Sequence, residues 1–269
     1  MPRMEQNKPG VALVLGAGSA RGLAHIGVLQ VLQENRVPLH LLVGSSMGAM
    51  VAATYACGAD IHMLGKMVNN IDTGLFFDIK VPRLGFIGGK KINELLQLLT
   101  KKKTFAEASP ELLVVATDLL QGEEVVLREG SISEAVRASI SIPGIFHPVK
   151  QEGMVLVDGA VTNRLPVEVA RREGAGVIIA VDVTFCEGKQ VRIQNTLDVI
   201  LTSLDILQRP QFEMASKKAD VLIQPRVGQY SSRDFEKSAE IIELGRQATQ
   251  EKLSEILALT HQTITGEVV

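Results

Sequence analysis

Residues 39–53 read LHLLVGSSMGAMVAA, an apolar run that passes through a Gly-Ser turn into a stretch of small residues. The run predicts a buried strand and the small residues predict a helix, so Ser46 lies on a sharp strand-to-helix turn. Gly44 and Gly48 stand two residues on either side of this serine, where they relieve crowding in such a turn. The helix start also favours a nearby negative charge. We therefore predict that Ser46 is a nucleophile.

A second strand-to-helix turn precedes the first, where residues 11–22 read VALVLGAGSARG. Backbone N–H groups in such a turn bind an anion, either a dinucleotide pyrophosphate or an oxyanion. A dinucleotide site requires G-x-G-x-x-G, but Arg21 holds the third glycine position and no carboxylate ends the next strand. A tight turn with only a packing role is the other alternative. Beside a candidate nucleophile the oxyanion reading is favoured, and we predict Gly18 and Ser19 as the N–H donors.

A third element is VLVDGA at residues 155–160, where Asp158 ends a short apolar strand. Sheets of the α/β class place catalytic groups at this end of their strands, although Asp-Gly is also a common turn. A nucleophilic serine requires a base, so Asp158 competes with the histidines for that role. No histidine has an obvious triad context, and His147 is the hardest to dismiss. The histidines of the chain are His25, His40, His62, His147 and His261.

Around these turns, strand-like runs alternate with helical patterns, which predicts an α/β fold. We expect a three-layer α/β/α sandwich with a mostly parallel central sheet. The predicted strands are 11–15, 39–43, 112–117, 155–157, 177–183 and 219–223, with 123–127 as an edge or hairpin partner. The predicted helices are 22–35, 47–57, 60–70, 91–102, 131–139, 166–173, 195–208 and 234–258. Residues 71–90 are expected to form an excursion or lid, and 224–234 a second loop.

Composition narrows the function classes. The 269 residues are 46% apolar and 22% charged, enough for one large core, and we expect a single domain over 1–269. A formal charge of −2 without long charge runs argues against a nucleic-acid partner. Cys57 and Cys186 lack zinc-site spacing, so we expect reduced thiols and no metal. The polar N-terminus and the shortness of the run 11–15 predict a cytoplasmic protein without a signal or membrane span.

Four segments together resemble bacterial patatin-like phospholipases, in the branch akin to the neuropathy target esterase catalytic domain. They read LGAGSARGLAHIGVL, GSSMG, EAVRASISIPGIF and VDGAVTNRLPVEVA. The resemblance covers about residues 11–183, and the strand and long helix at about 219–258 would complete the same domain. The family's commoner loop is G-G-G-x-R-G, whereas here Ala17 and Ser19 occupy glycine positions. A backbone N–H survives either change, so we expect the oxyanion hole to persist.

The resemblance implies a Ser-Asp dyad without a histidine, with Ser46 as nucleophile and Asp158 as base. These roles imply an acyl-enzyme, and we expect that no metal or organic cofactor is needed. Gly18 and Ser19 would form the oxyanion hole. The residues expected to support these turns are Gly16, Arg21, Gly22, Gly44, Gly48 and Gly159.

The dyad sets a physical condition on Asp158. A solvated aspartate has a pKa of about 4 and is a poor base for a hydroxyl, so this carboxyl must be partly desolvated. A cation beside it would lower its pKa again, so we expect Arg21 to point away, holding the loop or meeting an anionic headgroup. Asn163 and Arg164 are candidates for orienting the Asp turn. Ser45 and Ser139 are expected to be bystanders.

The resemblance implies a lipid acyl-ester substrate such as a phospholipid or lysophospholipid. Apolar clusters at 75–77, 86–87 and 142–146 are candidates for an acyl groove or a rim peripheral to the inner face of the membrane, with closure of the core as the alternative. Such contact would rest on apolar insertion, because the net charge gives little attraction to anionic lipid. The cluster Lys101–Lys103 is interpreted as a solvated helix end.

Other function classes share parts of this pattern. A non-catalytic lipid-binding or regulatory protein on the same fold would bind lipid without turnover. A Rossmann oxidoreductase would bind NAD(P), but the chain lacks its acidic residue. Within the hydrolases, an ordinary α/β-hydrolase with a late base such as His261 is the rival. Its elbow usually comes well into the chain, whereas here the elbow follows the first strand by about 30 residues.

Overall fold

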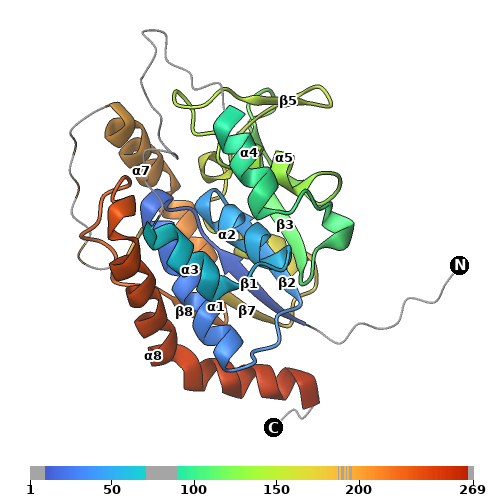
Figure 1. Cartoon of the computed structure of the whole chain (residues 1–269), viewed down its shortest axis with the longest axis vertical. Helices are drawn as coiled ribbons and strands as arrows, with labels where there is room; N and C mark the ends of the chain where they lie inside the picture. Colours follow the sequence, from blue (N-terminus) through green and yellow to red (C-terminus); the bar gives the residue numbers. More distant parts are fainter. Residues whose placement is uncertain are drawn as a thin grey trace, which may run out of the picture.

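The computed structural model describes residues 10–70, 90–186 and 196–265, with residues 188, 191 and 193 between the last two ranges. Within these ranges a single eight-stranded sheet has helices on both faces (Figure 1). Its strands are β1 (Val11–Leu15), β2 (Leu41–Ser45), β3 (Glu111–Asp118), β4 (Glu123–Leu127), β5 (Val149–Gln151), β6 (Met154–Asp158), β7 (Val177–Val181) and β8 (Val221–Ile223).

The sheet is mostly parallel, as predicted. Its order is β5-β6-β3-β2-β1-β7-β8, and β4 pairs with β3 outside this path. The five strands β3, β2, β1, β7 and β8 are parallel to one another. Strands β4 and β6 are antiparallel to β3, and β5 is antiparallel to β6. The central strands are runs of Val, Ile and Leu because both of their faces are covered.

The helices form the two outer layers. They are α1 (Ala24–Glu34), α2 (Met47–Ala56), α3 (Ile61–Asn70), α4 (Lys90–Leu99), α5 (Ile132–Ser139), α6 (Val167–Arg172), α7 (Thr196–Ser216) and α8 (Ser238–Thr265). Successive strand residues point to opposite faces, so Leu13 packs in the core beneath α1, α2, α5 and α8. Its neighbour Val14 packs on the other face, with residues of α6 and α7. The result is the expected three-layer α/β architecture.

Strand β3 positions the ends of two other strands. Strand β2 pairs with residues 111–115 of β3, and β4 pairs with residues 114–118. Both strands therefore pair with residues 114 and 115, so they must lie on opposite edges of β3. Strand β6 pairs with residues 116–118, which β4 also covers, and therefore lies on the same edge as β2. The two strands meet end to end along this edge. Ser45 is opposite Val115, and Asp158 is opposite Ala116.

The structure adjusts several predicted elements. Strand β5 was absent from the prediction, and β2 begins two residues later than predicted. The helix predicted for 195–208 extends to Ser216, through Pro210. Strand β4 has the predicted bounds and forms a hairpin with β3, and residues 224–234 contain no helix or strand. Residues 71–89 of the predicted lid, with its clusters 75–77 and 86–87, lie outside the described residues, and Lys90 begins α4.

Helices α1 and α8 approach each other closely along one face of the sheet (Figure 1). A Cβ on Gly27 would collide with the carbonyl of Ile242, and one on Gly245 with the carbonyl of Ala24. These glycines therefore allow α8, near the C-terminus, to pack directly on the helix that follows the first strand. In the described part of the chain, no helix is both long and apolar enough to cross a bilayer.

Candidate active site

Ser46 occupies a strained turn between β2 and α2. Its φ of 53° and ψ of −122° lie outside the regions that non-glycine residues prefer, a conformation that costs of the order of 1–3 kcal/mol. The flanking glycines allow the turn to form. A Cβ on Gly44 would strike the backbone of Ala49, and one on Gly48 the carbonyl of Leu15. The predicted elbow is therefore present, with its side chain held away from the strand.

Asp158 faces this serine. The Ser46 hydroxyl donates a hydrogen bond of 2.7 Å to Asp158 Oδ2, and the N–H of Ala160 donates one of 2.8 Å to Oδ1. The shared edge of β3 explains this proximity across 112 positions of sequence, because the carboxyl ends of β2 and β6 meet there. Gly159 has no space for a side chain, since a Cβ there would collide with the carbonyl of Val115.

Burial gives Asp158 the character that a base requires. The side chain is 2% exposed, and this desolvation raises the pKa of Asp158 to about 6. The hydrogen bonds from the Ser46 hydroxyl and the Ala160 N–H and the charge of Arg164 oppose the shift. The carboxylate is ionised at neutral pH, yet it is a stronger base than a solvated aspartate. The condition set from the sequence is met.

Two backbone N–H groups of the Gly-rich loop have no backbone acceptor among the described residues. The N–H groups of Gly16, Ala17 and Ala20 each donate to a backbone carbonyl. Among the described residues, the N–H groups of Gly18 and Ser19 have no such acceptor. Both residues line the same hollow as Ser46 and Asp158. The assignment of these two N–H groups as oxyanion donors stays a prediction.

Ser19 holds a conformation that favours glycine. Its φ is 51°, at one of the positions where the commoner family loop has glycine. The Ser19 hydroxyl donates a hydrogen bond of 2.7 Å to the carbonyl of Ser232, which also accepts the N–H of Ala20. The loop at 224–234 therefore holds Ser19 in this conformation. The contact spans 213 positions, and no local pattern predicts it.

His25 of α1 supports the Gly-rich loop through a hydrogen bond to its backbone. It is fully buried, and its Nε2 donates a hydrogen bond of 2.8 Å to the carbonyl of Gly16. Burial lowers the pKa of His25 to about 4, so the ring is neutral and holds the loop in place. Gly22 fits closely here too, because a Cβ would strike Met47.

Two arginines share one carboxylate beside the dyad. Arg164 Nη2 lies 2.7 Å from Asp205 Oδ1, and Arg21 Nη2 lies 4.0 Å from Asp205 Oδ2. Arg21 thus pairs with α7, and the charge that acts on Asp158 is that of Arg164. Asp205 was missing from the sequence-based candidates, because nothing in its helical context distinguishes it.

Arg164 also links the Asp turn to the Gly-rich loop, as its proposed orienting role would require. Its carbonyl accepts the N–H of Ala17, and its Nη1 donates to Thr184 Oγ1 at 3.2 Å. Thr184 in turn donates to the carbonyl of Ala17. Asn163 points elsewhere, since its amide donates to Glu124.

Ser139 was expected to be a bystander, and that expectation is wrong. Its Oγ accepts the N–H of Ser46 at 2.9 Å and donates to the carbonyl of Val115 at 2.6 Å. It thus holds the backbone of the elbow against β3. Ser45 fits its expected role better, because its buried hydroxyl has no hydrogen-bond partner among the described residues.

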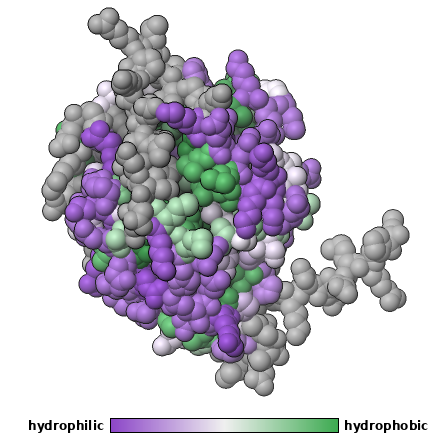
Figure 2. Space-filling model, viewed as in Figure 1, coloured by the Kyte–Doolittle hydropathy of each residue, from purple (hydrophilic) through white to green (hydrophobic). Residues whose placement is uncertain are grey.

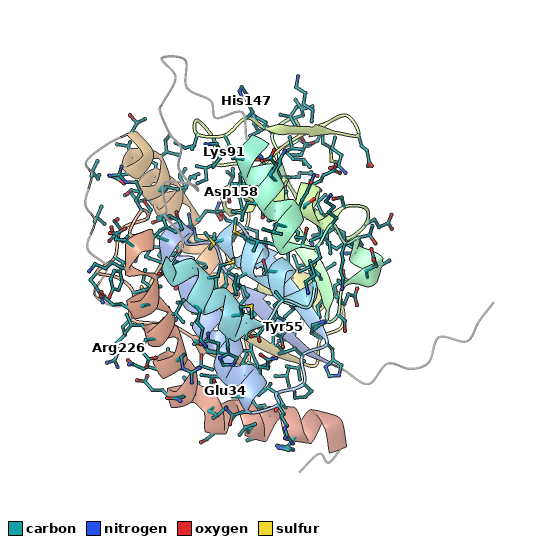
Figure 3. The ribbon with its side chains drawn as sticks, in the orientation of Figure 1. Glu34, Tyr55, Lys91, His147, Asp158 and Arg226 are labelled. Carbon is teal, nitrogen blue, oxygen red and sulfur yellow. The ribbon has the colours of Figure 1, made fainter. Side chains whose placement is uncertain are left out.

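The other histidines lie outside this arrangement. His147 is exposed and appears near the upper edge of Figure 3, with Asp158 further inside the view. His40 accepts the N–H of Val11, His62 lies 3.7 Å from Glu34, and His261 is an exposed residue of α8. No histidine replaces Asp158 as the partner of the Ser46 hydroxyl.

Ser46 opens onto two different hollows. The first, the polar hollow, contains both candidate dyad residues, the Gly-rich loop and the arginine pair. Its lining is Ala17, Gly18, Ser19, Arg21, Ser46, Ile142, Asp158, Ala160, Arg164, Leu201, Leu204, Asp205 and Ser232. The second, the apolar hollow, is lined by Ser19, Ser46, Met47, Met50, Ile92, Ile140, Ile142, Phe146 and Phe235. A group bound at Ser46 therefore has a charged side and an apolar side.

A family model described as patatin-like phospholipase matches residues 13–171. An uncharacterized NTE family protein of Mycobacterium tuberculosis is 30% identical over 271 residues, which cover 90% of this chain and 46% of that protein. A putative patatin-like phospholipase domain-containing protein of Caenorhabditis elegans is 33% identical over 183 residues, or 64% of this chain and 17% of that protein. The chain thus spans less than half the length of these relatives.

Solved structures share the fold at low sequence identity. The structure of VipD from Legionella pneumophila has a TM-score of 0.59 at 16% identity, over 92% of this chain and 67% of that one. Human GIVD cytosolic phospholipase A2, in complex with methyl gamma-linolenyl fluorophosphonate, has a TM-score of 0.52 at 12% identity, over 98% of this chain and 61% of that one.

Proposed function

This chain belongs to the patatin-like phospholipase family, and from that premise we propose that it hydrolyses acyl esters of lipids through an acyl-enzyme on Ser46. One observation carries the proposal. The Ser46 hydroxyl donates to a buried Asp158 carboxylate at 2.7 Å, on a strained turn beside two backbone N–H groups without acceptors among the described residues.

In the proposed first half-reaction, Asp158 Oδ2 accepts the hydroxyl proton as Ser46 Oγ attacks the ester carbonyl carbon. The carbonyl oxygen becomes an alkoxide, which the N–H groups of Gly18 and Ser19 stabilise. The intermediate then collapses, the bond to the alcohol oxygen breaks, and the alcohol leaves with the proton from Asp158. In the second half-reaction, Asp158 takes a proton from water as the water attacks the acyl-enzyme. The acid is released, and the proton returns to Ser46 Oγ.

The two hollows support a lipid substrate with distinct ends. The apolar hollow suits the acyl chain, because side chains such as Met50, Ile142 and Phe146 line it. The polar hollow suits the alcohol side, because Arg21 and Arg164 line it beside Asp205 and a guanidinium group can donate hydrogen bonds to a phosphate. We therefore propose phospholipids and lysophospholipids as substrates, with the anionic headgroup on the arginine side.

We further propose that the protein acts in the cytoplasm and touches the inner face of the membrane peripherally. Helix α7 supports this part of the proposal, because its inner residues Leu201 and Leu204 line the polar hollow while large apolar residues stand on its outer face. These exposed residues are Val199, Ile206, Leu207 and Met214. We also propose that the described elements act as one domain, since strands from both ends of the chain share the sheet.

The experiment that tests the function measures kcat/KM for p-nitrophenyl esters and lysophosphatidylcholine, together with labelling of Ser46 by a fluorophosphonate. We expect turnover and labelling by the wild type and loss of both in Ser46→Ala. Ser45→Ala is the matched control, because this neighbouring hydroxyl is buried but makes no hydrogen bond within the described residues. Lipid binding by the wild type without turnover or labelling would contradict the proposal and favour a regulatory protein on the same fold.

A further inference from the structure

A second apolar cavity, which we call the rear chamber, borders the apolar hollow and has no described lining residue in common with the polar hollow. Residues of α1, α2, α3 and α4 form it together with Leu23 and Phe235, and it has a volume of about 500 Å³ including its open side. Its lining is Leu23, Ile26, Met47, Met50, Val51, Thr54, Leu64, Met67, Val68, Leu99 and Phe235. In Figure 2, hydrophobic residues gather in the upper middle of the view, where Figure 1 places α2, α3 and α4.

The rear chamber adjoins the apolar hollow at Ser46. Met47, Met50 and Phe235 line both cavities, so these three side chains form the boundary between them. Methionine has three rotatable bonds and adapts its shape to a neighbouring group, which makes this boundary deformable. From Met47 to Thr54, helix α2 runs along the path for about 10 Å at its rise of 1.5 Å per residue.

The lining of the rear chamber excludes polar ligands. Thr54 is its single polar residue, and the Thr54 hydroxyl donates to the carbonyl of Met50 at 2.8 Å instead of facing the cavity. The remaining residues are aliphatic side chains, methionines and Phe235. A cavity of this kind offers water no hydrogen-bond partners and favours an apolar guest.

We propose that the rear chamber receives the methyl-terminal part of a long acyl chain whose ester carbonyl lies at Ser46. This rests on the proposed function and adds the acyl class, because a short chain ends within the apolar hollow and leaves the chamber empty. Each further methylene that enters the chamber leaves water and strengthens binding about fourfold. The enzyme is therefore a long-chain hydrolase, and α3 sets the upper limit on chain length.

The test fills the chamber from α3 and compares chain lengths. Val68 lines the chamber, whereas Met63 on the same helix is 67% exposed, so Val68→Phe and Met63→Phe form a matched pair. The measurement is kcat/KM for p-nitrophenyl butyrate and palmitate below their micellar concentrations. We expect Val68→Phe to lower the palmitate value at least tenfold and leave the butyrate value within twofold, while Met63→Phe changes neither.

A second variant keeps the proposal testable if Val68→Phe does not fold. Val68→Ala enlarges the chamber and is expected to raise the ratio of kcat/KM for stearoyl over myristoyl esters. Equal effects of Val68→Phe on both chain lengths, or no effect on the ratio from either variant, would overturn the chamber while leaving the hydrolase intact. Absence of hydrolysis and of Ser46 labelling in the wild type would overturn the proposed function and the chamber together.

Discussion

Polar groups differ between the two ends of the sheet: at one end several buried polar atoms lack partners within the described ranges, and at the other end polar side chains are paired near solvent. At the carboxyl end of the parallel strands, Asp158 is buried with a raised pKa, and Ser19 and Ser46 have positive φ. Near this end, buried nitrogen and oxygen atoms lack hydrogen-bond partners among the described residues. They are Arg21 Nε, His25 Nδ1, Ser45 Oγ and Arg164 Nε.

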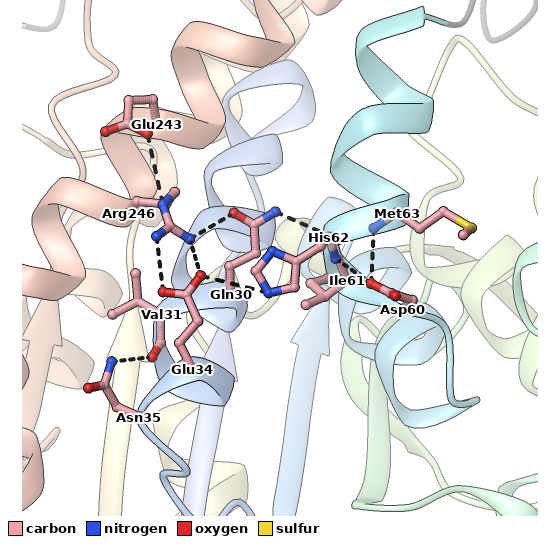
Figure 4. A network of polar contacts seen from close by, with 10 residues as sticks. All are labelled: Gln30, Val31, Glu34, Asn35, Asp60, Ile61, His62, Met63, Glu243 and Arg246. Atoms are coloured by element: carbon pink, nitrogen blue, oxygen red, sulfur yellow. Dashed lines mark hydrogen bonds and ion pairs between the residues drawn. The ribbon is translucent and has the colours of Figure 1, made fainter.

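At the other end, around Glu34 (labelled in Figure 3), polar side chains near solvent form hydrogen bonds and ion pairs with one another. Arg246 of α8 binds both carboxylate oxygens of Glu34 on α1, at 2.8 and 3.0 Å, and also contacts Gln30 (Figure 4). His62 of α3 lies 3.7 Å from the same glutamate. This network joins three helices, and none of its residues has a positive φ. The contrast shows that a desolvated carboxyl and a nucleophile candidate in a strained turn lie where chemistry is proposed. The residues of the described network that serves the fold have neither a positive φ nor a buried polar atom without a partner.

The strongest way to break this comparison is to remove the base. We expect Asp158→Asn to lower kcat/KM by about 10⁴-fold or more, because an amide cannot accept the Ser46 proton. His147→Ala is the control and is expected to keep activity. Ester kinetics on both variants, with circular dichroism as the check on folding, decide the matter. Loss of activity in a folded His147→Ala would move the base to that histidine and contradict the dyad.

The pH dependence sharpens the comparison without a mutation. Because burial raises the pKa of Asp158 to about 6, the carboxylate form predominates above that pH and the inactive acid form below it. We expect kcat/KM to be constant above pH 7 and to fall about tenfold per pH unit below pH 6. Initial rates with a p-nitrophenyl ester, read at an isosbestic wavelength, measure this limb. A limb centred near pH 4 would show that the carboxyl is solvated in the working enzyme.

Ser139 tests whether support of the elbow is distinct from chemistry. In Ser139→Ala the N–H of Ser46 loses its acceptor and the carbonyl of Val115 loses a donor, at a cost of about 1–3 kcal/mol in stability. We expect kcat to fall about tenfold while the pH limb is unchanged, because Asp158 keeps its surroundings. Ser133→Ala, on the same helix, is the control with unchanged kcat. A shifted pH limb in Ser139→Ala would argue that this serine acts on the base itself.

The smallest effect is expected at the far end. The Arg246–Glu34 pair is partly exposed, at 24% and 36% of the two side chains, so its removal by Arg246→Ala should cost no more than about 1 kcal/mol. We expect kcat/KM to remain within twofold of the wild type. Urea unfolding followed by ester kinetics measures both quantities. A large loss of activity here would show that the two ends of the sheet are coupled.

Much of the fold could be predicted because its central strands are uniform apolar runs, such as Val11–Leu15, that need cover on both faces. The edge strand β5 and the end of helix α7 were harder to predict. Strand β5 has three residues, Val149–Gln151, too few for any periodicity. Helix α7 was predicted to end before Pro210, yet it continues because Phe212 and Ala215 beyond the proline bury their side chains against the sheet.

The candidate site also contains residues that could be predicted and residues that could not. The glycines around Ser46 and the Asp-Gly turn are local patterns, so the sequence revealed the residues that the structure brings together. Ser139 and Asp205 are ordinary helical residues whose contacts are made across long sequence separations, and no local signal identifies them. The catalytic roles of Ser46 and Asp158 stay predictions until the variants are measured.

The meeting of β2 and β6 on one edge of β3 has a consequence for how the gene tolerates change. The distance between Ser46 and Asp158 is set by two pairing registers, and the length of the chain that joins the strands does not enter. That intervening chain contains turns at Gly122 and Gly153, both exposed and with open space around them. Insertions at these turns, even of a whole peptide tag, would lengthen the connection and leave the two oxygens in register.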